Sequence, residues 1–200
     1  MILGLNTATT RTYITLVNEG KIVDEKSWSA EQNEAETLLP ELQKMLDKNN
    51  LKWNNLDEIA VITGPGPFTA LRVSVAIANA IAYSIKASIL DIPAEDFWRA
   101  RAGGEFAVYA GGNKIYYHGN LLEADDFLSQ IKSGMTIAGQ LKNSHIEEIK
   151  SRGAEYIQEE NLKTLGEFIA ENGDKFERKA IVKPRYFTKP HITVSKKNYK

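Results

Sequence analysis

The residue types that could contact a phosphate group lie close to the N-terminus. Thr9 and Thr10 offer hydroxyl groups, and Arg11 offers a guanidinium, in a turn between two β-rich runs. The turn from Thr7 to Arg11 has no glycine, so the sequence predicts at most a weak phosphate contact and no strong nucleotide site. Asn6 ends the preceding run. Because an amide brings no charge, we expect poor divalent-metal binding there.

A second candidate is the turn Gly64-Pro65-Gly66-Pro67, which separates a short apolar run from a long apolar helix-forming stretch. A glycine-rich turn before a helix can bind anions through backbone N–H groups. The two prolines have no N–H, which leaves Gly64 and Gly66 as the donors of the turn. The sequence therefore favours a rigid structural turn over an anion site, and Pro67 suits the first turn of the helix.

The common catalytic constellations are missing from the sequence. His118, His145 and His191 fall on separate predicted elements, with no H-E-x-x-H pattern and no tight cluster with carboxylates. There is no G-x-S-x-G elbow, no Walker loop and no cysteine. These absences exclude a cysteine nucleophile and disulfides, and we expect neither a metal site nor a cofactor.

Hydrophobic patterning predicts the element order β-β-β-α-β-α-β for the first half of the chain. The first predicted helix, residues 34–48, has an apolar stripe at helical spacing and should kink at Pro40. The second, residues 68–85, is apolar nearly all round, which is typical of a helix buried on more than one side. Ribonuclease-H-like and actin-like ATPase domains share this order, so we predict an α/β fold with a mixed sheet. The predicted strands are residues 2–7, 12–17, 22–28, 59–63 and 87–92.

The second half of the chain repeats this order faintly. Pro93 and Gly103-Gly104 punctuate the sequence and place a boundary between the halves. We predict a first domain of residues 1–97, a reduced second α/β domain of 98–180 and a basic tail of 181–200. The elements expected in the second half are strands at 106–110, 114–118 and 135–138 and helices at 123–132, 143–150 and 161–171.

The net charge of −1 hides an uneven distribution. Residues 178–200 hold eight Lys or Arg and no acid, whereas the rest holds 17 basic and 26 acidic residues, a formal charge of −9. A basic tail on an acidic body indicates either an anionic partner or a solvated terminus. No apolar run reaches the ~18 residues that a membrane helix needs, and no basic leader precedes the first strand, so we expect a cytoplasmic protein without membrane contact.

Small residues recur every four positions along the second predicted helix, at Ala70, Ser74, Ala78 and Ala82. Such a ridge allows close approach by another helix or a sheet. Internal packing and contact with a partner both agree with this pattern, because the other sides of the helix are apolar as well.

The stretch G-P-G-P-F-T-A-L-R, from Gly64 to Arg72, resembles the signature G-P-G-S-F-T-G-L-R of the TsaB family, also called YeaZ. The similarity extends over residues 1–92, through I-L-G-L-N-T-A-T-T, E-T-L-L-P-E-L-Q-K-M-L and L-D-E-I-A-V-I-T. Near the end, Pro184-Arg185-Tyr186 is similar to the Pro-x-Tyr ending of the family. The chain departs from the family at Pro67, where Ser is usual, and at Asn6, where most members have Asp.

This resemblance implies a two-domain actin-like (ASKHA) fold and a protein with little or no catalysis of its own. TsaB proteins help to make threonylcarbamoyladenosine at position 37 of tRNAs; they pair with the TsaD enzyme, and TsaE, a small ATPase, joins the pair. The resemblance implies pairing through the two helices, with Arg72 either binding a partner carboxylate or forming an internal ion pair. The interface residues expected are Leu38, Leu39, Leu42, Phe68, Ala70, Leu71, Arg72, Ser74 and Ala78.

Two other hypotheses follow from the same features. The first is a stand-alone nucleotide-binding enzyme of the actin-like superfamily, in which Thr9, Thr10 and Arg11 meet phosphate. The second is direct contact between tRNA and the basic tail. An exposed apolar helix face also makes a homodimer plausible when the protein is alone.

Overall fold

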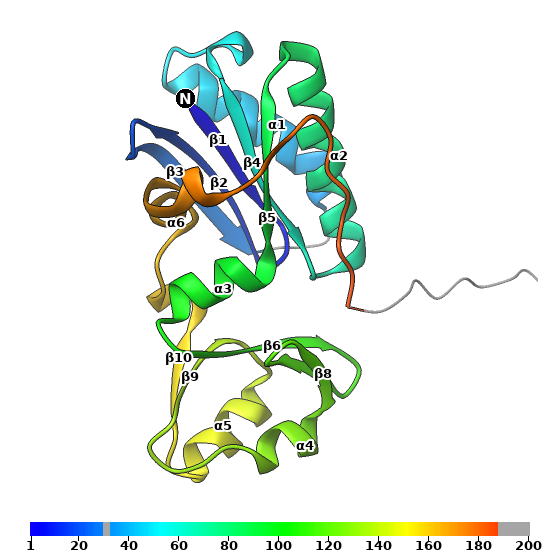
Figure 1. Ribbon diagram of the computed structural model, residues 1–200, viewed down its shortest axis with the longest axis vertical. Coiled ribbons are helices and arrows are strands. Elements are labelled where there is room, and N and C mark those ends of the chain that lie inside the picture. Colours follow the sequence, from blue (N-terminus) through cyan, green and yellow to red (C-terminus); the bar gives the residue numbers. More distant parts are fainter. Residues whose placement is uncertain (30–32, 188–200) are drawn as a thin grey trace, which may run out of the picture.

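The computed structural model describes residues 1–29 and 33–187, which form two β-sheets with helices packed on each (Figure 1). The first sheet consists of β1 (Ile2–Asn6), β2 (Arg11–Asn18), β3 (Lys21–Ser29), β4 (Glu58–Gly64), β5 (Ser88–Pro93) and β11 (Arg178–Lys179). Its strand order is β11-β5-β4-β1-β2-β3. β1, β2 and β3 form an antiparallel meander, and β4 and β5 extend the sheet in parallel with β1.

Both faces of the first sheet are covered. Helices α1 (Glu34–Lys48) and α2 (Phe68–Ile85) pack on one face, and α3 (Ala94–Ala102) and α6 (Leu165–Asn172) pack on the other. Alternate residues of β4 enter the two layers: Ile59 and Val61 join the core under α1 and α2, while Ala60 and Ile62 join the core under α3 and α6. This burial on both faces explains the unbroken apolar run of β4.

The second sheet repeats the topology of the first. Its strands are β6 (Glu105–Gly111), β7 (Lys114–Tyr117), β8 (Asn120–Glu123), β9 (Thr136–Gln140) and β10 (Glu155–Gln158), in the order β10-β9-β6-β7-β8. β6, β7 and β8 form an antiparallel meander, and β9 and β10 extend it in parallel, as β4 and β5 do in the first sheet. The two mixed sheets confirm the predicted actin-like fold class.

Short helices complete the second half. Helices α4 (Ala124–Ser129) and α5 (Asn143–Ser151) pack on one side of the second sheet, while Phe106 and Val108 of β6 pack with α3, which lies between the sheets (Figure 1). Three one-turn 3₁₀ helices connect elements at Trp53–Asn55, Glu159–Asn161 and Gly173–Lys175.

Most predicted elements are present, and the differences fall in the second half. The helices at 34–48 and 68–85 are confirmed, whereas the helices expected at 123–132 and 161–171 are shorter, at 124–129 and 165–172. Helix α3 and strands β8, β10 and β11 were not predicted from the sequence. That residues 98–180 form a separate domain remains a prediction. The last helix and strand of this range, α6 and β11, pack on the first sheet.

Candidate functional site

The ridge of small residues on α2 faces the interior. Ser74 and Ala78 are fully buried, and Ala70 and Ala82 are nearly so. The Thr7 hydroxyl lies 2.7 Å from Ser74 Oγ and 2.9 Å from the Ala70 carbonyl oxygen. The ridge thus lets the loop after β1 approach α2 closely, and it packs within the chain.

The expected interface residues divide into a buried and an exposed group. Six of them lie in the cores of the chain, where a partner cannot contact them directly: Leu38, Leu42, Ala70, Leu71, Ser74 and Ala78. The exposed ones are Leu39 (47% exposed), Phe68 (38% exposed) and Arg72. The Arg72 guanidinium lies 5.4 Å from the centre of the Phe68 ring, and it forms no ion pair with any residue in the described part of the chain.

The outer side of α1 and α2 presents a shallow apolar groove of about 320 Å³. Trp53 lines it and donates a hydrogen bond from Nε1 to Gln43 Oε1 at 2.8 Å. Tyr83 of α2, the residue before the groove-lining Ser84, has 88% of its surface exposed. We call the groove and the exposed Tyr83 together the α1/α2 face; the groove itself is lined by Leu39, Gln43, Trp53, Ile77, Ala80, Ile81 and Ser84. Trp53 and Tyr83 were not among the predicted interface residues, although a tyrosine near the end of a largely aliphatic helix was a usable signal.

The predicted turn at Gly64–Pro67 is held between two other segments. A Cβ atom on Gly64 would collide with the carbonyl oxygen of Arg185, and a Cβ atom on Gly66 would lie 2.7 Å from the Ala8 carbonyl oxygen. Gly64 also has φ +99°, which favours glycine. Both glycines are therefore explained by close backbone packing, which supports the rigid-turn interpretation.

The segment that covers this turn is an extended strap, residues 180–187, which runs beside α2 (Figure 1). Asn79 of α2 accepts a hydrogen bond from the Val182 N–H and donates one to its carbonyl, both at 3.0 Å. Tyr186 stacks on Phe68 with a centroid distance of 4.5 Å, and Phe187 packs on Tyr116 of the second sheet at 5.1 Å. The strap thus contacts both halves of the chain.

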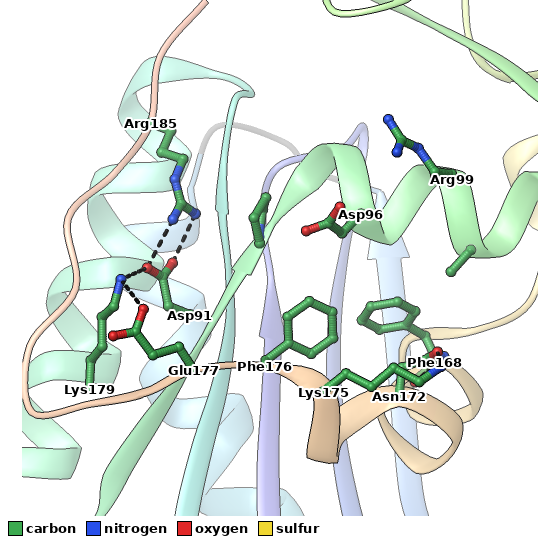
Figure 2. A pocket seen from close by; sticks show the side chains of 12 residues that line it. Asp91, Asp96, Arg99, Phe168, Asn172, Lys175, Phe176, Glu177, Lys179 and Arg185 are labelled. Atoms are coloured by element: carbon green, nitrogen blue, oxygen red, sulfur yellow. Dashed lines mark hydrogen bonds and ion pairs between the residues drawn. The ribbon is translucent and has the colours of Figure 1, made fainter.

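A buried carboxylate anchors the strap (Figure 2). Asp91 of β5 accepts two hydrogen bonds of 2.9 Å from the Arg185 guanidinium and one of 2.8 Å each from Lys179 and Thr63. Burial alone would raise the pKa of Asp91, but the hydrogen bonds from Lys179, Thr63 and Arg185 hold it below its ordinary value.

A cavity of about 520 Å³ adjoins this cluster (Figure 2). Four cations line it: Arg185 and Lys179 pair with Asp91, Arg99 pairs with Glu95, and Lys175 donates a hydrogen bond to Asn172 Oδ1 at 2.8 Å. Each of these cations thus already contacts a polar group of the described chain.

Of the residues predicted to contact phosphate, Thr9 and Thr10 line one cavity of about 510 Å³ at the start of α2, and Arg11 does not line it. The buried Thr9 hydroxyl donates to the Arg11 carbonyl at 2.6 Å, and the Arg11 side chain donates to Ser27 Oγ on β3 at 3.1 Å. Thr10 is exposed at the cleft between the sheets. Phosphate binding by these three residues remains a prediction.

A buried ion pair lies behind the same loop, where the two sheets meet. Arg101 of α3 places Nη1 3.5 Å from Glu159 Oε1 and Nη2 3.3 Å from the Glu159 carbonyl oxygen. Among the described residues, Glu159 Oε2 has no hydrogen-bond partner. Burial raises the pKa of Glu159, and the neighbouring Arg101 offsets this in part. Burial, together with the Glu159 charge, also raises the pKa of Tyr13 to about 12.

Within residues 1–29 and 33–187, no group of three or more His, Asp or Glu side chains is placed to hold a metal ion. His118 pairs with Glu105 at 2.9 Å, His145 is buried on α5, and His191 lies outside the described residues. Among the described helices, α2 alone is long and apolar enough to cross a membrane, with 18 residues. This differs from the expectation that no apolar run of that length is present. The inner side of α2 packs in the core of the first sheet.

Comparison with known proteins adds independent evidence. The family model described as TsaD, tRNA N6-adenosine threonylcarbamoyltransferase, matches residues 27–95. The tRNA threonylcarbamoyladenosine biosynthesis protein TsaB of Buchnera aphidicola is 30% identical over 88 residues, covering 42% of each chain. TsaB of Bacillus subtilis is 28% identical over 92 residues, which cover 46% of this chain and 38% of that protein.

The resemblance to the TsaB/YeaZ family is confirmed. A solved Pseudomonas aeruginosa protein with similarity to peptidase YEAZ superposes with a TM-score of 0.68 at 17% identity, covering 94% of this chain and 99% of the other. At that identity the likeness concerns the fold. The TsaB-like chain spans less than half of the length of the curated relatives that it matches.

Proposed function

We propose that this TsaB-like chain is a non-catalytic partner of a TsaD-like enzyme in the threonylcarbamoylation of tRNA adenosine at position 37, in the cytoplasm. The observation that carries the proposal is the α1/α2 face, an apolar surface on the two helices that hold the family motifs. Within the described chain this face is uncovered, and its Tyr83 is 88% exposed. Exposed apolar surfaces of this kind mark sites of protein association.

The exposed and the buried residues of the two helices contribute to the interface in different ways. Tyr83, Ile77 and Leu39 supply contact area, and aromatic anchors such as Tyr83 carry much of the binding energy in protein interfaces. Leu38, Leu42 and Ala78 hold the helices against the sheet and keep that surface in shape. A TsaE-like ATPase would join the assembled pair, and a homodimer through the same face would compete with it.

The test is the mass in solution, measured by size exclusion with light scattering. The chain is run alone and mixed with the TsaD-like protein of the same organism. We expect a mixed complex at micromolar concentration. Tyr83→Glu and Ala80→Glu should prevent it, because each places a charge in an apolar interface while altering an exposed side chain.

Val23→Glu is the matched control, since Val23 is 43% exposed on β3, away from the face. A mixed complex that survives both face variants would refute the proposed interface, and no complex with the native chain would refute the partnership. Ala78→Trp is a poor test: Ala78 is fully buried, so the substitution would disturb the core.

The alternative, a nucleotide-binding enzyme, is tested by calorimetry with ATP and magnesium. We expect no tight binding, because Thr9 and Arg11 use their side chains within the chain. Tight binding that is lost in Arg11→Ala would favour the alternative.

A further inference from the structure

The strap runs beside α2 and is tied to it at two points (Figure 1). Val182 exchanges two hydrogen bonds of 3.0 Å with the Asn79 side chain, and Tyr186 stacks on Phe68 at a centroid distance of 4.5 Å. Phe68 and Asn79 are about three helical turns apart, so they lie on the same side of α2. The strap therefore follows one side of α2 over that length.

Tyr83 connects this side of α2 to the α1/α2 face. It follows Asn79 by one helical turn and so lies on the side of the strap, and it precedes Ser84, which lines the groove. With 88% of its surface exposed, its ring is accessible to another protein. The α1/α2 face thus continues across α2 to the strap.

The strap presents alternate side chains to the core and to solvent. Val182 is buried in the core under α1 and α2, whereas its neighbours Ile181 and Lys183 are exposed, with 65% of the Ile181 surface accessible. Neighbouring side chains of an extended segment point to opposite sides, so the burial of Val182 directs Ile181 and Lys183 outward. The strap thereby adds apolar area and a positive charge to the surface.

Two cations of this surface form no ion pair with the described residues. They are Lys183 on the strap and Arg72 on α2, which lies between the two points where the strap is tied to the helix. Arg185, the other cation of the strap, is held by Asp91. Cations at the edge of an apolar surface favour a partner that places carboxylates opposite them.

The strap is fixed in place within the free chain. The Arg185 guanidinium pairs with Asp91, and its backbone N–H donates to the Thr63 carbonyl at 2.6 Å. Just before the strap, β11 pairs with β5. A segment that is already ordered loses little conformational freedom on binding, so its contacts contribute more fully to affinity.

We propose that the strap is a second docking element for the TsaD-like protein. Ile181 enters the apolar interface beside Tyr83, and Lys183 with Arg72 binds carboxylates of the partner. This inference rests on the proposed function and adds the chemistry of the partner surface, which is apolar and bordered by acidic side chains on the side of the strap.

The experiment is calorimetric titration of the TsaD-like protein with the full chain. Ile181→Glu should weaken binding at least about tenfold, because it places a charge in an apolar interface. Lys183→Glu should weaken it about fivefold at about 0.1 M salt, as expected for the loss of an exposed ion pair. This effect should disappear at about 1 M salt, where the Debye length is about 3 Å. Arg72→Glu should show the same salt dependence.

Val23→Glu is the matched control for the apolar position, since Val23 is 43% exposed on β3. Lys132→Glu is the control for the charge, since Lys132 is an exposed lysine of the second half of the chain. Both should bind like the native chain, and thermal unfolding shows that every variant keeps its fold.

A native complex that Ile181→Glu and Lys183→Glu leave unchanged would overturn the strap proposal alone. So would equal losses in Lys183→Glu and Lys132→Glu, since the effect would then come from net charge. A complex that is lost in Tyr83→Glu but kept in Ile181→Glu would restrict docking to the α1/α2 face. Absence of any complex with the native chain would overturn the partnership itself, and the role of the strap with it.

Discussion

Asp91 and Arg185 are separated by 94 residues in the sequence and form a two-pronged ion pair, with both N–O distances at 2.9 Å. Asp91 lies on a central strand, and Arg185 lies on the strap that covers the Gly64–Pro67 turn. The same strap brings Tyr186 against Phe68, the first residue of α2. One ion pair therefore connects the end of the described chain to the turn that carries the family signature.

Replacing Asp91 with Asn should destabilise the protein by about 1.5–2 kcal/mol. The variant removes the charge that Arg185 and Lys179 share, and hydrogen bonds to charged groups contribute about 1.5–3 kcal/mol. We take the lower part of that range because Arg185 is 40% exposed. The measurement is urea unfolding, with Glu177→Gln as control, since the Glu177 carboxylate is 74% exposed. Equal losses in both variants would contradict this role for Asp91.

The contribution of Asp91 should also depend on pH. Its pKa is lower in the folded state than the ordinary value of 3.8, so its stabilising effect is complete above that value and is lost as the pH falls towards the folded pKa. We therefore expect the free-energy difference between the native chain and Asp91→Asn to be constant near neutral pH and to shrink below about pH 4. A difference that grows on acidification would contradict the assignment.

Elements with strong patterns were predictable from the sequence, and short ones were not. The apolar run of β4 and the 18 residues of α2 gave clear signals. β8 and β10 have four residues each, too few to show a period, so the complete repeat of the five-strand order was missed. α3 was missed because Pro93 before it and Gly103 after it suggested a linker; in the structure they are its N-cap and C-cap.

The candidate site was only partly predictable for a different reason. Since α2 is apolar nearly all round, its sequence does not show which side faces the sheet, and buried Ser74 and exposed Tyr83 could not be distinguished. The strap depends on the contact between Asp91 and Arg185, and a pair so distant in the sequence leaves no local pattern.

Gly64→Ala should be more destabilising than Gly103→Ala. Both glycines have positive φ, at +99° and +64°, so each substitution carries the conformational cost of about 1–2 kcal/mol. At Gly103 the new methyl group meets open space, whereas at Gly64 it meets the Arg185 carbonyl and comes within 2.7 Å of Leu71 Cδ1. The additional loss at Gly64, measured by thermal unfolding, should reach at least about 1 kcal/mol. Similar losses at the two positions would show that the strap moves to accommodate the new methyl group at little cost in stability.

Glu159 should have the opposite pH dependence to Asp91. Burial raises its pKa above the ordinary value of 4.5, so the folded state binds the proton more tightly than the unfolded chain. Stability should therefore fall as the pH rises from 4.5 through the folded pKa, where the buried carboxylate ionises beside Arg101. Glu159→Gln removes this ionisation, so the fall should be absent in the variant. The check is the free energy of unfolding of both proteins across that range, and parallel curves would assign the pH dependence to another group.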